Sequence, residues 1–163
     1  MRDKDLLLGI DIGTTGTKCS VYDFRGIRVA SAYREYPMIH PRPGWTEQDP
    51  SRWWDTVCCN LQTIFKSQNI DKNRIAAVGT SSTNAVVLVD RQGQPVCNDI
   101  SLHDQRSGHQ VEWLKENIGE ERIRGVAANR IANGSFCLPA LRWLVENQAD
   151  LIKGAYKLMV PCG

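Results

Sequence analysis

The sequence lacks the features that would place it in a membrane or against a charged polymer. No stretch approaches about 18 uninterrupted apolar residues, and the apolar run that starts at Leu6 breaks at Asp11, too early for a signal-peptide core. The 20 basic and 18 acidic residues are scattered in both signs, with a net charge of +2 and no basic run. We therefore expect a cytoplasmic protein that binds neither nucleic acid nor membrane.

Paired cysteine motifs are also absent. The six cysteines include no Cys-x-x-Cys pair, and most lie in apolar or regular segments, so we expect reduced structural thiols rather than disulfides. The three histidines are too dispersed to form a metal site by themselves. With 42% hydrophobic and 23% charged residues, the 163-residue chain can bury the core of one soluble globular domain.

The first half of the chain predicts a three-stranded meander followed by a long helix. The strands are expected at about 5–11, 17–23 and 27–36. Asp49 and Pro50 are typical of an N-cap and a first helical position, and the spacing of the apolar residues that follow predicts a helix over about 51–67. On this spacing Trp54 is expected in the core, whereas Trp45 is expected to pin the preceding proline-rich loop onto the domain.

The second half predicts short buried strands at 75–80 and 85–89, helices at about 105–117 and 139–147, and a final strand at about 155–160. Together with the meander, these elements predict an α/β fold with a mixed sheet. The first three strands are expected to be antiparallel, the later strands to join parallel to the first, and the helices to pack on the sheet.

The strongest chemical signal is the segment Gly9-Ile10-Asp11-Ile12-Gly13-Thr14-Thr15-Gly16-Thr17-Lys18. Gly13 lets backbone N–H groups approach an anion, Thr14 and Thr15 add hydroxyl donors, and Asp11 is placed to hold Mg²⁺ and its waters. The spacing of a Walker loop is missing, and a strand rather than a helix follows. The alternative is an ordinary hairpin in which the same side chains satisfy the backbone of the turn.

Several segments, in the same order along the chain, resemble the FGGY carbohydrate kinases. The family motif D-x-G-T-[TS]-x-x-[KR] is matched from Asp11 to Lys18, and the more specific P-G-W-x-E-x-D-P is matched from Pro43 to Pro50. Further matches include Trp53-Trp54 and Asp104-Gln105-Arg106, so the resemblance runs from about residue 6 to about 160. It implies a ribonuclease H-like fold of the actin, hexokinase and Hsp70 class, a mixed sheet with flanking helices.

The resemblance also implies an activity, which is transfer of the γ-phosphoryl group of ATP to a hydroxyl group of a sugar or polyol. Residues 1–163 would then form an incomplete N-terminal domain, inactive alone, and the chain's own C-terminal domain would supply the general base and the adenosine site. ATP and Mg²⁺ are the implied cofactors, with Asp11 as the catalytic residue that orients the metal. The implied phosphate contacts are Gly13, Thr14, Thr15 and Lys18. The resemblance leaves a homodimer open.

The implied sugar pocket falls on two later segments. Thr83 and Asn84 follow a strand, where many xylulose kinases have Met-His, and Asp104 and Arg106 match a W-x-D-x-R motif whose tryptophan is Leu102 here. These departures leave the identity of the sugar open. The alternative for Asp104 and Arg106 is a local ion pair or helix cap, which is worth little if exposed.

Two other functional classes compete with a kinase. Another actin-like ATPase would share the hairpin but has no reason to contain the segment Pro43–Pro50. A ribonuclease H-like nuclease would need convergent carboxylates for two metals, and the early strands supply only Asp11 and Asp23. A non-enzymatic ribonuclease H-like interaction domain is the remaining form of this third class. We therefore predict a carbohydrate kinase.

Overall fold

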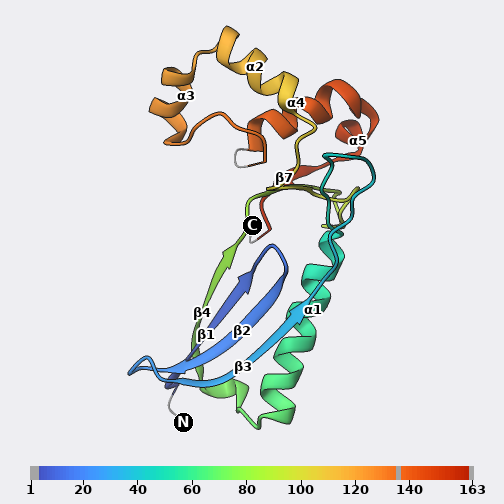
Figure 1. Ribbon diagram of the computed structural model, residues 1–163. Coiled ribbons are helices and arrows are strands. Elements are labelled where there is room, and N and C mark those ends of the chain that lie inside the picture. Colours follow the sequence, from blue (N-terminus) through green and yellow to red (C-terminus); the bar gives the residue numbers. More distant parts are fainter. Residues whose placement is uncertain (1–3, 135–136, 162–163) are drawn as a thin grey trace. The chain divides into compact units, whose positions relative to one another are not determined.

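The computed structural model describes residues 4–134 and 137–161. These residues divide into two compact units, each with its own sheet (Figure 1). The first unit comprises residues 4–37 and Ser51–Thr83, and the second comprises Met38–Pro50 and the described part of Asn84–Pro161.

Within the described part of the first unit, four strands form one mixed sheet in the order β3-β2-β1-β4 (Figure 1). They are β1 (Leu6–Ile12), β2 (Gly16–Asp23), β3 (Arg28–Glu35) and β4 (Ile75–Ser82). β1 pairs antiparallel with β2, and β2 with β3, whereas β4 runs parallel to β1. The predicted meander and the mixed character of the sheet are confirmed.

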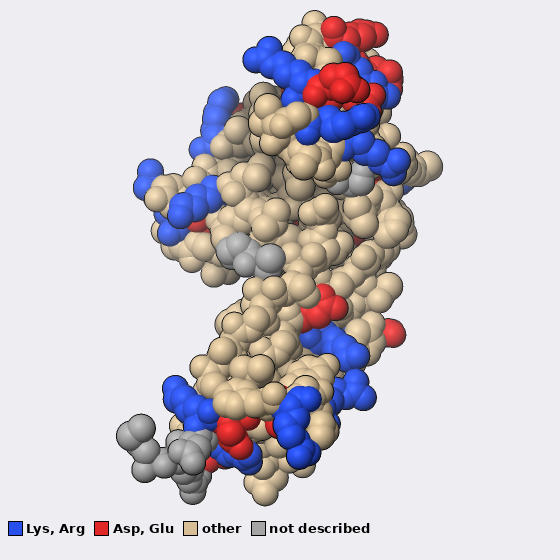
Figure 2. Space-filling view, turned by 90° about the vertical axis from the view of Figure 1, so that its left-hand side faces the viewer, with Lys and Arg blue, Asp and Glu red and all other residues tan. Residues whose placement is uncertain are grey.

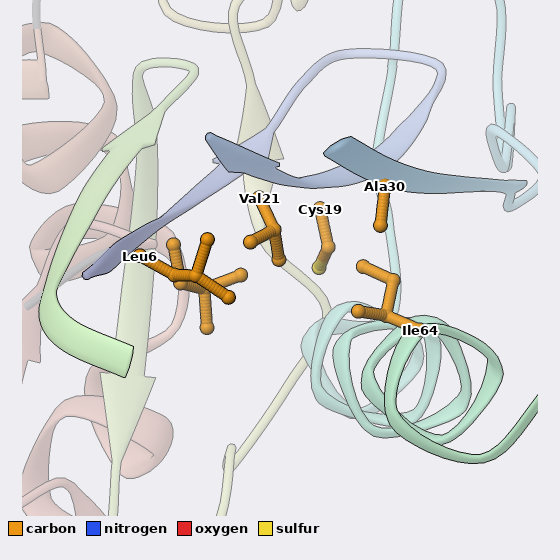
Figure 3. Close-up of a cluster of buried hydrophobic side chains, with 6 residues drawn as sticks. Leu6, Cys19, Val21, Ala30 and Ile64 are labelled. Atoms are coloured by element: carbon orange, nitrogen blue, oxygen red, sulfur yellow. The ribbon is translucent and has the colours of Figure 1, made fainter. Parts of the chain in front are cut away.

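One face of this sheet packs against helix α1 (Pro50–Gln62) and the π-helical turn η1 (Thr63–Ser67) that continues it. Alternate residues of the strands point to this face, as a period of two requires. Figure 3 shows Ile64, from η1, directed toward the sheet. The buried cluster consists of Leu6, Leu8, Cys19, Val21, Ala30 and Ile64. Burying an aliphatic side chain contributes about 1.5–3 kcal/mol, so this cluster fixes the helix to the strands.

The buried face of α1 is shifted by about one position along the sequence from the predicted face. Trp53 is 4% exposed and Trp54 is 69% exposed, so the prediction that Trp54 belongs to the core is wrong. The buried face includes two polar residues that bond to β2: the Asn60 amide donates to the Thr17 carbonyl at 2.9 Å, and the Thr56 hydroxyl lies 2.9 Å from that of Thr17. A hydrophobic pattern counts such residues as exposed, although paired polar groups can be buried.

Strand β4 lies at the edge of the sheet and is exposed along most of its length. The prediction of a buried strand at 75–80 is therefore wrong about burial, and the strand also continues to Ser82. Val78, for example, is 56% exposed. An apolar run can have the same composition in a central strand and in an edge strand. The run alone does not show which neighbouring elements cover it, so its burial cannot be read from it. The short 3₁₀ turn η2 (Lys72–Arg74) precedes this strand.

In the described part of the second unit, three strands form a small antiparallel sheet in the order β6-β5-β7. They are β5 (Ala85–Val89), β6 (Ile100–Ser101) and β7 (Lys157–Met159). β5 is buried at every position, as predicted. The prediction that later strands join parallel to the first holds for β4 and is wrong for these three, which pair among themselves.

The helices of the second unit are α2 (Gly108–Asn117), α3 (Glu120–Ala127), α4 (Cys137–Asn147) and α5 (Ala149–Gly154). α2 and α4 lie where helices are predicted, whereas α3 and α5 are short helices that the sequence pattern missed. Two buried clusters hold the unit together. The first consists of Val86, Leu88, Ile100, Ala140 and Leu144, and the second of Val111, Leu114, Ile123 and Ile131.

The thiols and the surface agree with the composition. The cysteines at 19, 58, 59, 97 and 137 are free, as predicted, while Cys162 lies outside the described residues. Burial raises the pKa of Cys19 to about 11, which keeps it a protonated core residue. Figure 2 shows basic and acidic side chains interspersed on the face in view. None of the helices in the described ranges is long and apolar enough to cross a membrane.

Candidate functional site

The turn between β1 and β2 is closed by its own backbone. The N–H of Gly13 donates to the carbonyl oxygen of Gly16 at 3.0 Å. A Cβ atom on Gly13 would lie 3.1 Å from that same oxygen, whereas a Cβ atom on Gly16 would lie 2.5 Å from the carbonyl oxygen of Arg34. Gly16 is therefore the position where a side chain is excluded most strictly, although the sequence motif drew attention to Gly13.

Two tyrosines at the end of β3 contact this turn. The hydroxyl of Tyr33, which is half exposed, lies 3.2 Å from the hydroxyl of Thr15. Tyr36 is buried, and its hydroxyl donates to the carbonyl oxygen of Gly13. Sequence reasoning missed both residues. The available signal was their position in, or directly after, the strand that pairs with β2, where polar aromatic side chains can reach the turn.

Four polar side chains lie in register across the sheet. Asp11 pairs with Lys18 in β2 and with Ser81 in β4, and Lys18 pairs with Tyr33 in β3. Directly paired residues point to the same face, so these four form one row, which we call the polar row. Asp11, Lys18 and Ser81 also line one open groove of about 480 Å³. The structure therefore brings the predicted Asp11 and Lys18 together and adds Ser81, which sequence reasoning missed.

The carboxylate of Asp11 suits a magnesium ion. The Ser81 hydroxyl donates to one of its oxygens at 2.6 Å, and the residue is exposed at the groove. Within residues 4–134 and 137–161, no three His, Cys, Asp or Glu side chains gather as a metal site. A cation here would therefore depend on one carboxylate, water and the oxygens of a ligand. Mg²⁺ is commonly bound this way, through one or two carboxylates and phosphate oxygens.

Thr83 and Asn84 fall in different units. The Thr83 N–H donates to the carbonyl oxygen of Ile12 at 2.8 Å, and its hydroxyl lies 3.5 Å from that of Thr14. Thr83 therefore lies beside the hairpin, next to a residue predicted to contact phosphate. Asn84 is exposed and precedes β5 in the second unit.

Asp104 and Arg106 form a buried ion cluster with Glu47. The Arg106 guanidinium contacts both oxygens of Asp104 at 2.8–3.0 Å and donates to Glu47 at 2.7 Å. The side chains of Arg106 and Asp104 are only 4% and 1% exposed. The guanidinium also lies 3.8 Å from the ring centroid of Trp45, which confirms that Trp45 pins its loop. The local ion pair is thus formed, but it is buried rather than exposed.

Two buried aspartates hold the proline-rich loop through its backbone. The N–H of Thr46 donates to Asp104 at 2.6 Å, and the N–H of Gln48 donates to Asp99. In return, the N–H groups of Ser101 and Asp99 donate to the carbonyl oxygens of Thr46 and Gln48 at 3.0 and 2.9 Å. Burial raises the pKa of Asp99 to about 7, against the opposing effect of its hydrogen bonds from Ser101 and Gln48. Sequence reasoning missed Asp99.

The two carboxylates on which a nuclease site would depend do not converge. Asp23 pairs with Leu6, at the opposite end of β1 from Asp11. It closes the β2–β3 turn by accepting the N–H groups of Arg25 and Ile27, each at 2.9 Å. Asp23 is therefore a turn residue, and this geometry argues against the nuclease alternative.

Comparison with known families decides the assignment. Residues 6–162 match the FGGY family of carbohydrate kinases, N-terminal domain. The chain belongs to this family. It is similar to a xylulose kinase of Staphylococcus xylosus, with 31% identity over 156 residues, or 95% of this chain and 32% of the relative. It is also similar to a glycerol kinase of Haloferax volcanii, with 33% identity over 146 residues, or 88% of this chain and 28% of the relative.

The fold agrees with this membership. A xylulose kinase structure from Rhodospirillum rubrum superposes with a TM-score of 0.88 at 24% identity, over 96% of this chain and 32% of that chain. The predicted family and the actin-like fold class, a mixed sheet with helices, are confirmed. This FGGY chain spans about a third of the length of the curated relatives it matches.

Proposed function

We propose that this FGGY chain supplies the phosphate and metal site of an enzyme that transfers the γ-phosphoryl group of ATP to a hydroxyl of a sugar or polyol. The observation that supports this most directly is the polar row beside the hairpin, where an exposed carboxylate and an exposed ammonium group line one groove. Phosphoryl transfer depends on positioning and on charge neutralisation. The arrangement of the polar row meets both requirements.

The proposed roles follow from the contacts of each residue. Asp11, oriented by Ser81, would hold the water shell of Mg²⁺, which neutralises charge on the phosphates when bound. Thr14 and Thr15, in the turn closed by Gly13, would donate to phosphate oxygens. Lys18 lines the same groove as Asp11 and would offset the negative charge of the transferred group. Each role uses a side chain at the turn or in the groove.

For the sugar subsite we propose Asn84, Asp104 and Arg106 of the second unit. Thr83, the fourth residue that the resemblance implies, belongs to the first unit and lies there, beside the hairpin. The contacts favour different roles within this set. Asp104 is buried, and both its oxygens accept hydrogen bonds from Arg106. A carboxylate with its lone pairs engaged has little capacity for a further hydroxyl. Asp104 and Arg106 would therefore shape the pocket by fixing the loop that bears Glu47, while the exposed Asn84 is free of that constraint.

We further propose that the general base and the adenosine site lie in the C-terminal domain of the enzyme, which corresponds to the part of the relatives that this chain does not cover. A cytoplasmic enzyme acting on a small sugar fits this proposal. The names of the relatives, xylulose kinase and glycerol kinase, favour a sugar or polyol as acceptor.

The phosphate site is tested by titrating the labelled 163-residue chain with ATP and Mg²⁺ and following its amide resonances. We expect weak binding, with shifts clustered at Gly13, Thr14 and Thr15. Shifts confined to other parts of the chain would refute the hairpin as the phosphate site.

The proposal that the general base lies outside these residues is tested by measuring turnover. The chain alone should release no ADP in a sugar-dependent manner with xylulose, ribulose, glycerol or erythritol. Loss of a general base costs about a hundred- to ten-thousand-fold in rate, and loss of positioning costs several further powers of ten. Sugar-dependent turnover of about 1 per second or more would show that the base lies within these residues.

A further inference from the structure

We propose that Tyr33 is a further phosphate-contacting residue of the hairpin site. The inference rests on the proposed function, because it assigns one more side chain to the same phosphates. It starts from the polar row, in which Tyr33 is the direct cross-strand partner of Lys18. The side chain of Tyr33 therefore lies on the face that also bears Asp11 and Lys18.

The end of the Tyr33 side chain lies against the backbone of the turn. A Cβ atom on Gly16 would be 2.6 Å from the Tyr33 hydroxyl oxygen and 2.7 Å from the ring carbon that bears it. The glycine thus leaves space that the phenol end of Tyr33 occupies. The carbonyl oxygen of Arg34, at 2.5 Å, already excludes a side chain at Gly16, and the Tyr33 contact adds to it. The contact also places the Tyr33 hydroxyl at the residue where the turn enters β2.

The hydroxyl of Tyr33 also has capacity to bind a ligand. It lies 3.2 Å from the Thr15 hydroxyl, and the residue is 50% exposed. A phenol hydroxyl has one proton to donate and accepts through its oxygen. The Thr15 hydroxyl has a single proton, so when it donates to Tyr33 it no longer donates to a phosphate, and the Tyr33 proton makes that contact with the phosphate oxygen instead. A hydrogen bond to an anionic oxygen is shorter and about twice as strong as a neutral one.

Tyr22, in β2, and Tyr36, directly after β3, provide the contrast. The Tyr36 hydroxyl is buried and already donates to the Gly13 carbonyl, so it supports the turn rather than a ligand. Tyr22 lines the groove that contains Asp11, but it lies four residues from Lys18 along β2 and pairs with Leu7 of β1. That distance is about 13 Å along the strand. Tyr22→Phe is therefore the matched control for Tyr33→Phe.

The test uses the 163-residue chain labelled at the tyrosine ring carbon that bears the hydroxyl, titrated with ATP and Mg²⁺. We expect the Tyr33 resonance to shift together with the Thr15 amide, with one common Kd, while the Tyr22 resonance stays in place. Loss of one hydrogen bond to a charged group should weaken binding about 10- to 100-fold in Tyr33→Phe. Tyr22→Phe should bind as the unaltered chain does, and Thr15→Ser, which keeps the hydroxyl, should retain the Tyr33 shift.

The outcomes separate this inference from the proposed function. If the hairpin amides shift but the Tyr33 resonance does not, and Tyr33→Phe binds with unchanged affinity, the role of Tyr33 is refuted and the phosphate site stands. If the hairpin amides do not respond at all, both are refuted. A purely structural role for Tyr33 would change the amide resonances of Gly13–Gly16 in the free variant without any ligand-dependent shift of the tyrosine signal, which would also overturn the inference.

Discussion

The polar row of the first unit and the ion cluster of the second unit each contain an aspartate that the sequence singled out, yet the two carboxylates are in opposite states. Asp11 is exposed at a groove and accepts the hydroxyl of Ser81. Asp104 is 1% exposed and accepts N–H groups from Thr46 and Arg106 on its two oxygens. A carboxylate with open capacity at a groove can bind a ligand, whereas a saturated, buried carboxylate fixes the scaffold around one.

The balance of charge sharpens the contrast. In the described part of the second unit, the guanidinium of Arg106 forms ion pairs with both Glu47 and Asp104. The charges of these two carboxylates also act on the carboxyl group of Asp99 and raise its pKa. Buried charges of one sign are costly unless each has a partner. The cluster should therefore respond strongly to the loss of a charge, and the exposed polar row should respond little.

The largest expected effect is that of Arg106→Met. The variant leaves the buried Asp104 and the partly buried Glu47 without their shared cation, so the free energy of unfolding should fall by about 3–5 kcal/mol. Urea unfolding followed by the amide signals of the second unit measures this loss. Lys18→Met, which removes an exposed cation from the polar row, is the control and should change stability little. Equal stabilities for the two variants would abolish the distinction between the two sites.

The hairpin could be predicted from sequence because its information is local. Asp11 and Lys18 are joined by one short turn, so their spacing already places them opposite each other on paired strands. Tyr33 joins the same row only through the register between β2 and β3. Ser81 does so through a parallel pairing, across 70 residues of sequence. Long-range register is set by packing, which no short window of sequence contains.

Burial of polar groups is the second part that sequence could not supply. The sequence singled out Asp104 and Arg106 as sugar-pocket residues, and the structure shows them as a buried ion pair. The identity of a charged residue is the same whether it contacts solvent, a ligand or a buried partner. The same limit explains α1, where Thr56 and Asn60 turn inward to bond with Thr17 and Trp54 turns outward. Composition predicts which apolar residues can be buried, but it does not predict which polar residues are buried with a hydrogen-bond or ion-pair partner.

The next effect in size is a pH dependence that originates at Asp99. Burial raises its pKa from 3.8 to about 7, and the charges of Glu47 and Asp104 act in the same direction. The folded state therefore binds more protons than the unfolded state between these values, so stability falls as pH rises from about 4 to about 7. Asp99→Asn keeps an acceptor for the N–H of Gln48 without the charge.

At pH 8 the variant should exceed the unaltered chain in stability by on the order of 2–4 kcal/mol, and at pH 4 the difference should be small. Urea unfolding at the two values provides the measurement. Stability curves that run parallel across this range would mean that Asp99 is already ionised in the folded chain, and that the cluster tolerates a further negative charge.

The smallest expected effect is that of Ser81→Ala in the polar row. The Ser81 hydroxyl donates to Asp11 at 2.6 Å across a parallel strand pair, and both residues are exposed. An exposed hydrogen bond of this kind contributes at most about 1 kcal/mol to stability, so unfolding by urea should change little. The loss should instead appear in metal binding, because the carboxylate that would orient the metal becomes free to rotate.

We therefore expect Ser81→Ala to weaken Mn²⁺ binding in the presence of ATP by about 2- to 5-fold, the equivalent of a fraction of one hydrogen bond. Paramagnetic broadening of the Asp11 and Gly13 amide signals measures this affinity directly and without turnover. Ser81→Thr keeps a hydroxyl at the same position and should restore it. If Ser81→Ala and Ser81→Thr bind the metal alike, then Ser81 does not orient Asp11, and the exposed carboxylate selects its own rotamer. The contrast with Asp104 would then rest on burial alone, since neither the stability of the fold nor the affinity of the site would depend on what contacts Asp11.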